Sequence, residues 1–469
     1  MKVFALLSPT IRNSSTRRLF SATPHRDTNI AIAGGGAAGF YTAARLLSKT
    51  TDTTIDIFEQ LPTPHGLVRY GVAPDHPEVK NCMTKFDQVS GNPRVRYFGN
   101  VRVGDTLTLD TLRSMYSGVV LSYGASADRQ LGIPGEELVV PARRFVAWYN
   151  GLPEAQGLDI DLRRVDRVVI IGHGNVALDC ARILLTDPSD LASTDITAQA
   201  LSALRESNVK HVEMVGRRGP LQVAFTTKEL REMTKIPHLR ILCDRDLVAS
   251  ECEKWASFVD SSRSLKRMMD LLMSHAGKGG GEKSFTLSFL KSPVEVTERG
   301  VRFQVNRLDG PVDQAKAVGT GEYIDTPSGL VLRSVGYATT PIAGAPFDER
   351  RRIVPNIAGR VTHNGDVVPG LYAAGWAKRG PVGVIATTMQ DAYRTGDAII
   401  MDITNGHLRS GLPRDSVDEG LRESGVLESC VTNEQWKHLE AFEVEAGRRV
   451  GKPREKVTSV DRMLDIIGV

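Results

Sequence analysis

The chain has 469 residues, of which 41% are hydrophobic and 24% are charged, and its formal net charge at pH 7 is +4. This length allows about two or three globular domains. The weak net charge gives no reason to expect nucleic-acid binding, and no apolar run reaches the ~18–20 residues that cross a membrane. The five cysteines are scattered and none forms a C-x-x-C pair. A redox disulfide, an iron–sulfur cluster and a zinc site therefore lack their ligands, and we expect no bound metal.

Residues 1–26 have the composition of a targeting segment. They are rich in Ser and Thr, contain no acidic residue, and hold five basic residues, Lys2, Arg12, Arg17, Arg18 and Arg26. Such composition is typical of mitochondrial transit peptides. We therefore expect a mitochondrial protein, in the matrix or on the matrix face of the inner membrane, whose remaining chain is close to neutral.

The first predicted unit begins with a nucleotide-binding fingerprint. An apolar run at 30–33 leads into Gly34, Gly36 and Gly39, which fill the G-x-G-x-x-G positions, and then into a small-residue helix. A second apolar strand ends at Glu59, where a carboxylate would accept hydrogen bonds from ribose hydroxyls. This strand–turn–helix pattern predicts a dinucleotide site for a cofactor with free ribose hydroxyls.

Residues 60–81 form a long loop rich in Gly and Pro, a type of segment that is usually functional or disordered inside a compact domain. Its apolar residues argue against disorder. The apolar run GVVLSYGA at 118–125, a strand that leads into glycine, then closes the first unit, which we assign to residues 27–126. A surface helix is expected before Gly151.

A second fingerprint follows the apolar run at 168–171. Gly172, Gly174 and Ala177 form G-x-G-x-x-A, and the next strand ends in Arg217 and Arg218 instead of an acid. Two guanidinium groups would bind a 2′-phosphate, whereas a carboxylate would repel it. The second unit, residues 127–335, is therefore predicted to bind NADP(H).

From residue 336 the pattern returns to the first unit, with a strand, a loop and a helix, and ends in a polar helical extension. The predicted fold is α/β, with two Rossmann-like dinucleotide-binding domains. The FAD domain is discontinuous (27–126 and 336–469), and the NADP domain is inserted into it. FAD and NADPH are the simplest pairing for such domains, because the cofactors then carry the hydride chemistry and no protein nucleophile is needed.

Long motifs in this sequence resemble the adrenodoxin reductase family, the mitochondrial ferredoxin–NADP reductases. They include HGLVRYGVAPDHPEVKN, GHGNVALDCARILLT, VGRRGPLQVAFTTKELREM, GWAKRGPVGVIATTM and GKPREK, and the similarity extends from about residue 28 to the end. The resemblance implies electron transfer from NADPH through FAD to an acidic [2Fe–2S] ferredoxin. Such ferredoxins serve cytochromes P450, haem A synthesis or iron–sulfur cluster assembly.

The resemblance also implies roles for individual residues. For FAD it implies Ala38, Glu59, Leu67, Val103, Trp376, Gly383, Val384 and Ile385. For NADP(H) it implies His173, Gly174, Asn175, Val176, Arg217, Arg218, Glu229 and Gly383. His173 replaces the Gln that the family usually carries, so we expect NADP(H) binding to depend on pH between 6 and 8.

His76 and Asp179 are the ionisable pair that we expect near the flavin, either as a proton path or as a structural hydrogen bond. We expect the acidic ferredoxin to dock on four basic residues, Arg231, Arg263, Lys266 and Arg267. The alternative is that these residues form a solvated basic face that binds no partner. The expected mitochondrial location, without a membrane-spanning segment, allows a peripheral association with the inner membrane.

Two other functions remain open at this point. The NADPH-oxidising subunit of glutamate synthase shares both nucleotide folds, but it normally carries cysteine-rich cluster motifs that this sequence lacks. A nucleotide-binding sensor without catalysis would also keep both fingerprints.

Overall fold

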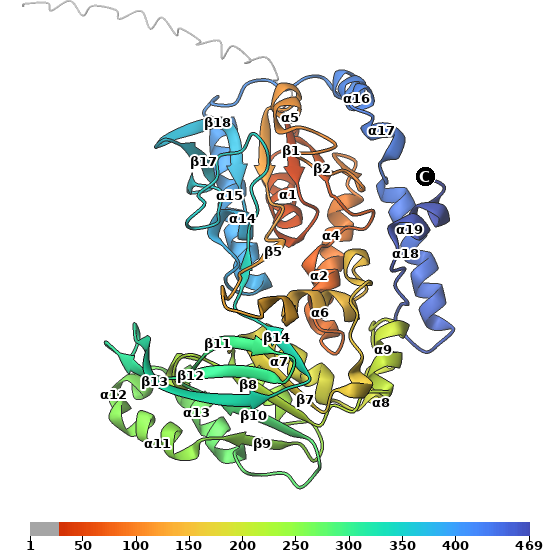
Figure 1. Cartoon of the computed structure of the whole chain (residues 1–469). Helices are drawn as coiled ribbons and strands as arrows, with labels where there is room; N and C mark the ends of the chain where they lie inside the picture. Colours follow the sequence, from red (N-terminus) through yellow and green to blue (C-terminus); the bar gives the residue numbers. More distant parts are fainter. Residues whose placement is uncertain (1–27) are drawn as a thin grey trace, which may run out of the picture.

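The computed structural model describes residues 28–469. It has two lobes, each built on its own sheet, and Figure 1 shows the second lobe packed against one end of the first. The expected transit peptide, residues 1–26, lies outside the described residues.

The first lobe contains a seven-stranded sheet in the order β16-β17-β18-β4-β1-β2-β3. Its strands are β1 (Asn29–Ala33), β2 (Thr54–Phe58), β3 (Val95–Phe98), β4 (Gly118–Leu121), β16 (Asn356–Ile357), β17 (Arg360–His363) and β18 (Asp366–Ala373). The run from β18 to β3 is parallel, whereas β16 and β17 add to it as an antiparallel edge. Segments before residue 122 and after residue 355 thus share one sheet, as the predicted discontinuous fold requires.

The helices of the first lobe flank this sheet. They are α1 (Ala37–Lys49), α2 (Leu67–Tyr70), α3 (Pro77–Lys80), α4 (Cys82–Ser90), α5 (Leu109–Met115), α14 (Trp376–Arg379) and α15 (Ile385–Thr404). The two short helices α2 and α3 lie within residues 60–81, so the segment expected to be a loop contains two single helical turns. Both turns begin next to Gly or Pro, which interrupt longer helices.

The second lobe contains a parallel six-stranded sheet in the order β6-β14-β7-β8-β10-β9. Its strands are β6 (Val140–Pro141), β7 (Arg167–Ile171), β8 (His211–Val215), β9 (Arg240–Cys243), β10 (Ser284–Ser288) and β14 (Leu330–Arg333). A separate antiparallel sheet holds β11 (Lys291–Thr297), β12 (Gly300–Asp309) and β13 (Lys316–Pro327). The predicted α/β class with two Rossmann-like domains is confirmed.

The helices of the second lobe are α6 (Ala142–Tyr149), α7 (Asn175–Leu185), α8 (Pro188–Leu191), α9 (Ala198–Arg205), α10 (Thr227–Met233), α11 (Arg245–Lys254), α12 (Ala256–Ser261) and α13 (Arg263–His275). Helix α6 is not the surface helix that we expected. Phe145 and Tyr149 are fully buried, because α6 packs between α7 and α9.

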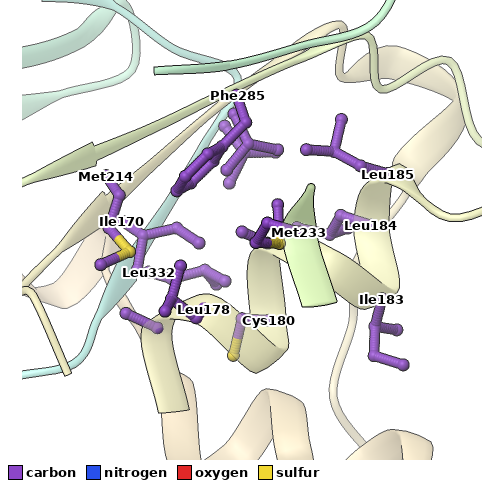
Figure 2. Packing of buried hydrophobic residues seen from close by; sticks show 14 of the residues in the cluster. Ile170, Leu178, Cys180, Ile183, Leu184, Leu185, Met214, Met233, Phe285 and Leu332 are labelled. Atoms are coloured by element: carbon purple, nitrogen blue, oxygen red, sulfur yellow. The ribbon is translucent and has the colours of Figure 1, made fainter. Parts of the chain in front are cut away.

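The hydrophobic core of the second lobe lies between this sheet and α7. Figure 2 shows Ile170, Met214, Phe285 and Leu332, one from each of four strands, beside the side chains of α7. All four are buried. Parallel strands covered on both faces require such continuous apolar runs, which explains the VVII pattern before the second fingerprint.

Two connections link the lobes, and they pair with each other. β5 (Ala127–Asp128) leaves the first lobe, β15 (Tyr337–Ala338) returns to it, and the two form an antiparallel pair. The C-terminal helices α16 (Arg414–Glu423), α17 (Val426–Ser429), α18 (Asn433–Arg448) and α19 (Val460–Ile467) run along the first lobe towards α8 and α9 (Figure 1). Among residues 28–469, no helix combines the length and the apolar character needed to cross a membrane.

Candidate functional site

The first glycine turn connects β1 to α1, and each glycine has its own steric reason. Gly34 adopts φ +111°, and a Cβ on it would lie 2.6 Å from the Ser122 carbonyl oxygen. A Cβ on Gly39 would lie 2.2 Å from the Gly34 oxygen. A Cβ on Gly36, in contrast, would meet no atom within 4 Å. The outer glycines therefore allow close packing, while Gly36 faces open space at a helix N-terminus, where a pyrophosphate would bind.

Glu59 lies immediately beside this turn, at the end of β2. Its carboxylate accepts hydrogen bonds from the backbone N–H groups of Gly35 (2.8 Å) and Leu61 (3.2 Å). Burial raises the pKa of Glu59 to about 7. The Glu59 backbone carbonyl accepts from Val101 N–H at 2.8 Å, so the segment that leads to Val103 is held at the end of β2. A ribose bound here would donate its hydroxyls to a side chain already fixed in place.

Two further segments close around the first turn. A Cβ on Gly66 would lie 3.3 Å from the Cα of Gly36, and a Cβ on Gly375 would lie 2.5 Å from the Cβ of Ala38. Leu67 and Trp376 directly follow these two glycines. The structure thus brings the FAD residues expected at 38, 59, 67 and 376 to one place.

Helix α15 begins at Ile385, and no side chain caps its N-terminus. Gly383 adopts φ +85° just before it. Arg379 holds this approach in place by donating to Thr388 Oγ1 at 2.9 Å and to the Val382 carbonyl. The free N–H groups and the dipole of this 20-residue helix can stabilise negative charge on a bound group.

The second glycine turn, between β7 and α7, repeats the geometry of the first. Gly172 adopts φ +125°, and a Cβ on it would lie 2.1 Å from the Ser334 carbonyl oxygen. A Cβ on Gly174 would meet no atom within 4 Å. Ala177 is fully buried. The turn again offers an open position at a helix N-terminus, which Asn175 and Val176 begin.

Arg217 and Arg218 follow β8 at the same edge of the sheet. Their backbone is fixed, because Asn306 Nδ2 donates to the Arg217 carbonyl (3.0 Å) and Leu290 N–H donates to the Arg218 carbonyl (3.1 Å). Neither guanidinium forms an ion pair within residues 28–469. Both are free to bind a 2′-phosphate.

The His173 side chain packs against the end of β8. Its Nε2 lies 3.0 Å from the Met214 carbonyl oxygen, and its ring packs 5.2 Å from that of Phe289. Burial lowers the pKa of His173 to about 4, so the ring stays neutral between pH 6 and 8. The ring faces the end of β8, which argues against pH-sensitive NADP(H) binding through this residue.

His76 and Asp179 meet between the lobes, together with Glu229. One ligand atom from each of the three lies within 4.8 Å of the others, and His76 Nδ1 is 4.0 Å from Glu229 Oε2. Arg182 occupies the same space, 2.8 Å from Asp179 and 3.5 Å from Glu229. The Arg182 guanidinium therefore compensates part of the negative charge of this cluster.

The protonation of this cluster is shifted by burial. Desolvation raises the pKa of Asp179 and that of Glu229, although Arg182 opposes it in both. Sequence reasoning placed Glu229 with NADP(H) and missed Arg182 and Asp75, whose carboxylate accepts from Arg182 Nε at 2.5 Å. The available signals were that Asp75 precedes His76 and that Arg182 lies one helical turn after Asp179.

The four expected docking residues lie on two neighbouring helices. Thr227 of α10 donates to the Ser264 carbonyl of α13 at 3.4 Å, so Arg231 and α13 belong to one surface. Arg231, Arg263 and Arg267 are exposed, whereas Lys266 already pairs with Asp260 at 2.7 Å. The basic face therefore presents three arginines.

No protein-family model matches this chain, but individual proteins do. The chain is 46% identical over 470 residues to the mitochondrial NADPH:adrenodoxin oxidoreductase of Bos taurus, which covers 95% of this chain and 93% of that protein. The chain belongs to the NADPH:adrenodoxin oxidoreductase family. The mitochondrial member of this family from Arabidopsis thaliana is 41% identical, covering 95% of this chain and 97% of its own length.

A solved structure agrees with this family membership. Mycobacterium tuberculosis FprA in complex with NADPH superposes with a TM-score of 0.88 at 39% identity, covering 95% of this chain and all of that one. The two glycine turns of this adrenodoxin oxidoreductase family member each leave room for a dinucleotide, FAD or NADP(H). The Glu59 carboxylate and the unpaired Arg217 and Arg218 guanidinium groups have the chemistry that ribose hydroxyls and a 2′-phosphate, respectively, require.

Proposed function

We propose that this protein is an NADPH-dependent flavoprotein that reduces a [2Fe–2S] ferredoxin of the adrenodoxin type. One observation carries the proposal: Gly36 and Gly174 face open space in two matching turns, one beside a carboxylate and the other beside two free guanidinium groups. Bound FAD would supply the redox chemistry, taking a hydride from NADPH and releasing single electrons to the ferredoxin.

Each of the two large sheets belongs to one of the two proposed domains. We assign residues 27–126 and 336–469 to the FAD domain and residues 127–335 to the NADP domain. Gly34, Gly36, Ala38, Gly39 and Glu59 would hold the FAD nucleotide, and Leu67, Val103, Trp376, Gly383, Val384 and Ile385 would surround its ring. Gly174, Asn175 and Val176 would hold the NADP pyrophosphate, with His173 contributing its backbone.

His76, Asp179 and Glu229 would hold and move a proton at this site. The support is that burial favours the protonated carboxylates, while the Arg182 guanidinium keeps them beside His76. A His76→Ala variant should reduce the flavin more slowly than wild type. An unchanged rate of flavin reduction and of ferredoxin turnover would assign this cluster a purely structural role.

The docking surface would be the basic face of α10 and α13. Arg231, Arg263 and Arg267 are exposed and can pair with carboxylates of an acidic ferredoxin. The relatives named above are mitochondrial proteins, and residues 1–26 have a matching composition, so we assign this protein to the mitochondrion. Peripheral association with the inner membrane stays a prediction.

The deciding experiment measures NADPH-driven cytochrome c reduction with and without a mitochondrial [2Fe–2S] ferredoxin. We expect a yellow protein whose flavin absorbance is bleached by NADPH and not by NADH, and whose cytochrome c reduction depends on ferredoxin. Turnover that ignores ferredoxin would contradict the proposed acceptor. A protein that binds both nucleotides without bleaching would instead be a sensor.

A further inference from the structure

One short segment of the first lobe pairs with the second lobe at every ionisable side chain. In residues 75–80, DHPEVK, Asp75 pairs with Arg182 at 2.5 Å and Glu78 pairs with Lys228 at 3.1 Å. His76 lies 4.0 Å from Glu229, and Lys80 pairs with Asp195 at 2.6 Å. We call residues 75–80 the cross-lobe segment. The pairs of Asp75 and His76 adjoin the proposed site, but the pair of Lys80 is separate from it.

Asp195 lies between two lysines of the first lobe. Its carboxylate is 2.6 and 2.8 Å from the Lys80 Nζ and 3.0 Å from the Lys456 Nζ. All three residues are at least nine-tenths buried. Asp195 precedes α9 in the second lobe, Lys80 ends α3, and Lys456 lies between α18 and α19. The three side chains, which we call the latch, thus join three distant parts of the sequence.

Further hydrogen bonds between side chains and backbone join the two segments that carry Lys456 and Asp195. Lys452 donates to the Ile196 carbonyl, and Ala198 N–H donates to Glu455 Oε1 at 2.9 Å. Gly151, which ends the WYNG segment after α6, has no room for a side chain, since its Cβ would lie 2.8 Å from Thr197 Cγ2. The GKPREK motif, residues 451–456, and the segment after α6 therefore meet at this junction.

We infer that Asp195 is a positioning residue, which through Lys80 and Lys456 fixes the second lobe on the first and so fixes how the two nucleotide sites face each other. This inference rests on the proposed function. A buried ion pair has strict geometric requirements, because each charge has lost its water and is compensated only by its partner. Sliding or rotation of one lobe against the other would separate Asp195 from both lysines at once. Reactions between two bound groups depend steeply on such placement.

The test compares Asp195→Asn, which keeps the side-chain shape, with Asp195→Glu, which keeps the charge. The matched control is Glu282→Gln, because Glu282 pairs with Lys210 at 2.7 Å on the exposed surface of the same lobe. Four quantities are measured on the purified holoprotein: FAD content, NADP+ affinity, the rate of flavin reduction by NADPH, and amide hydrogen exchange over residues 192–198 and 451–458.

For Asp195→Asn we expect unchanged FAD content and NADP+ affinity, faster exchange in both segments, and flavin reduction slowed about ten- to a hundredfold. Asp195→Glu should recover part of the rate. Unchanged reduction and unchanged exchange would overturn the inference, and so would a loss of NADP+ affinity as large as the loss of rate. If Asp195→Asn does not fold, Lys80→Met, which leaves Lys456 to pair with Asp195, undergoes the same measurements. If NADPH fails to bleach even the wild type, the proposed function fails, while hydrogen exchange still tests the latch.

Discussion

Arg182 in the second lobe binds Asp75 in the first lobe through two hydrogen bonds, with Nε 2.5 Å from Oδ2 and Nη2 3.0 Å from Oδ1. The same guanidinium also contacts Asp179 and Glu229. Arg182 is 3% exposed, so three carboxylates depend on one buried cation. Arg182 therefore compensates buried charge and also contacts Asp179 and Glu229, the two carboxylates of the proposed proton path.

Replacing Arg182 with Met should therefore destabilise the protein strongly. Removing one partner of a buried ion pair typically costs about 3–5 kcal/mol, because the remaining charges stay buried without compensation. Urea unfolding, followed by tryptophan fluorescence, measures the change. Arg163→Met is the control, because Arg163 pairs with Asp161 on the exposed surface and should matter little. Equal stability of the two variants would contradict the role of Arg182.

Gly36→Ala and Gly174→Ala should separate the two nucleotide sites. A Cβ at either position meets no protein atom within 4 Å, so both variants should fold normally. Gly36→Ala should lose FAD, whereas Gly174→Ala should keep FAD and bind NADP+ more weakly, because each methyl group takes the place of a phosphate. Absorbance at the flavin band and NADP+ titration measure the two effects. Gly157→Ala is the control, since it also meets open space; normal binding in both variants would refute these assignments.

Arg217→Ala and Arg218→Ala should weaken the preference for NADPH over NADH. A hydrogen bond to a charged group contributes about 1.5–3 kcal/mol, so each variant should raise the KM for NADPH by roughly ten- to a hundredfold. The KM for NADH should stay the same, because NADH carries no 2′-phosphate. Arg240→Ala, an exposed arginine on β9, should change neither constant. A parallel rise in both KM values would place these arginines elsewhere in the site.

Arg263→Glu combined with Arg267→Glu should impair ferredoxin reduction. Charge reversal on α13 repels an acidic partner, so the KM for ferredoxin should rise and its dependence on salt should weaken. The rate at which NADPH reduces a small neutral acceptor through the protein should not change, because this reaction does not require ferredoxin to dock. Arg299→Glu, in the exposed turn between β11 and β12, is the control. Loss of both activities would indicate a structural effect instead of docking.

Lys456→Met should change how stability depends on pH. Burial lowers the pKa of Lys456 from 10.5 to about 7, with Asp195 opposing this shift and Lys80 and Arg69 adding to it. Between these values the unfolded chain binds a proton that the folded chain lacks, so Lys456 lowers stability increasingly as the pH falls from about 10.5 to 7. The stability of Lys456→Met relative to wild type should therefore rise as the pH falls over this window and level off below it.

Urea unfolding between pH 6 and 9 tests this prediction. Lys210→Met serves as the control, because Lys210 lies on the exposed surface and pairs with Glu282. A stability difference between Lys456→Met and wild type that stays constant with pH would show that Lys456 is not held at a lowered pKa in the folded protein.

The two glycine turns could be predicted from sequence because their geometry is local. In each turn, a strand, the spaced glycines and a helix follow one another within a dozen residues, and steric exclusion at Gly34 and Gly172 depends on backbone conformation. The positions of Glu59 and Arg217 were predictable for the same reason, since the end of the next strand lies at the same edge of a parallel sheet.

The side-chain networks were not predictable in this way. His173 occupies a fingerprint position, yet its ring turns towards Met214, because the partners that surround it come from β8 and the segment after β10. The buried face of α6 was also missed, since the helices that cover it are α7 and α9.

The sequence by itself determined the two dinucleotide folds and the family, because these depend on contiguous motifs and on backbone sterics. Only the tertiary structure decided how the lobes are joined. Lys80, Asp195 and Lys456 are distant in sequence, and the free energy of a buried charge depends on which partners the fold brings within about 3 Å of it.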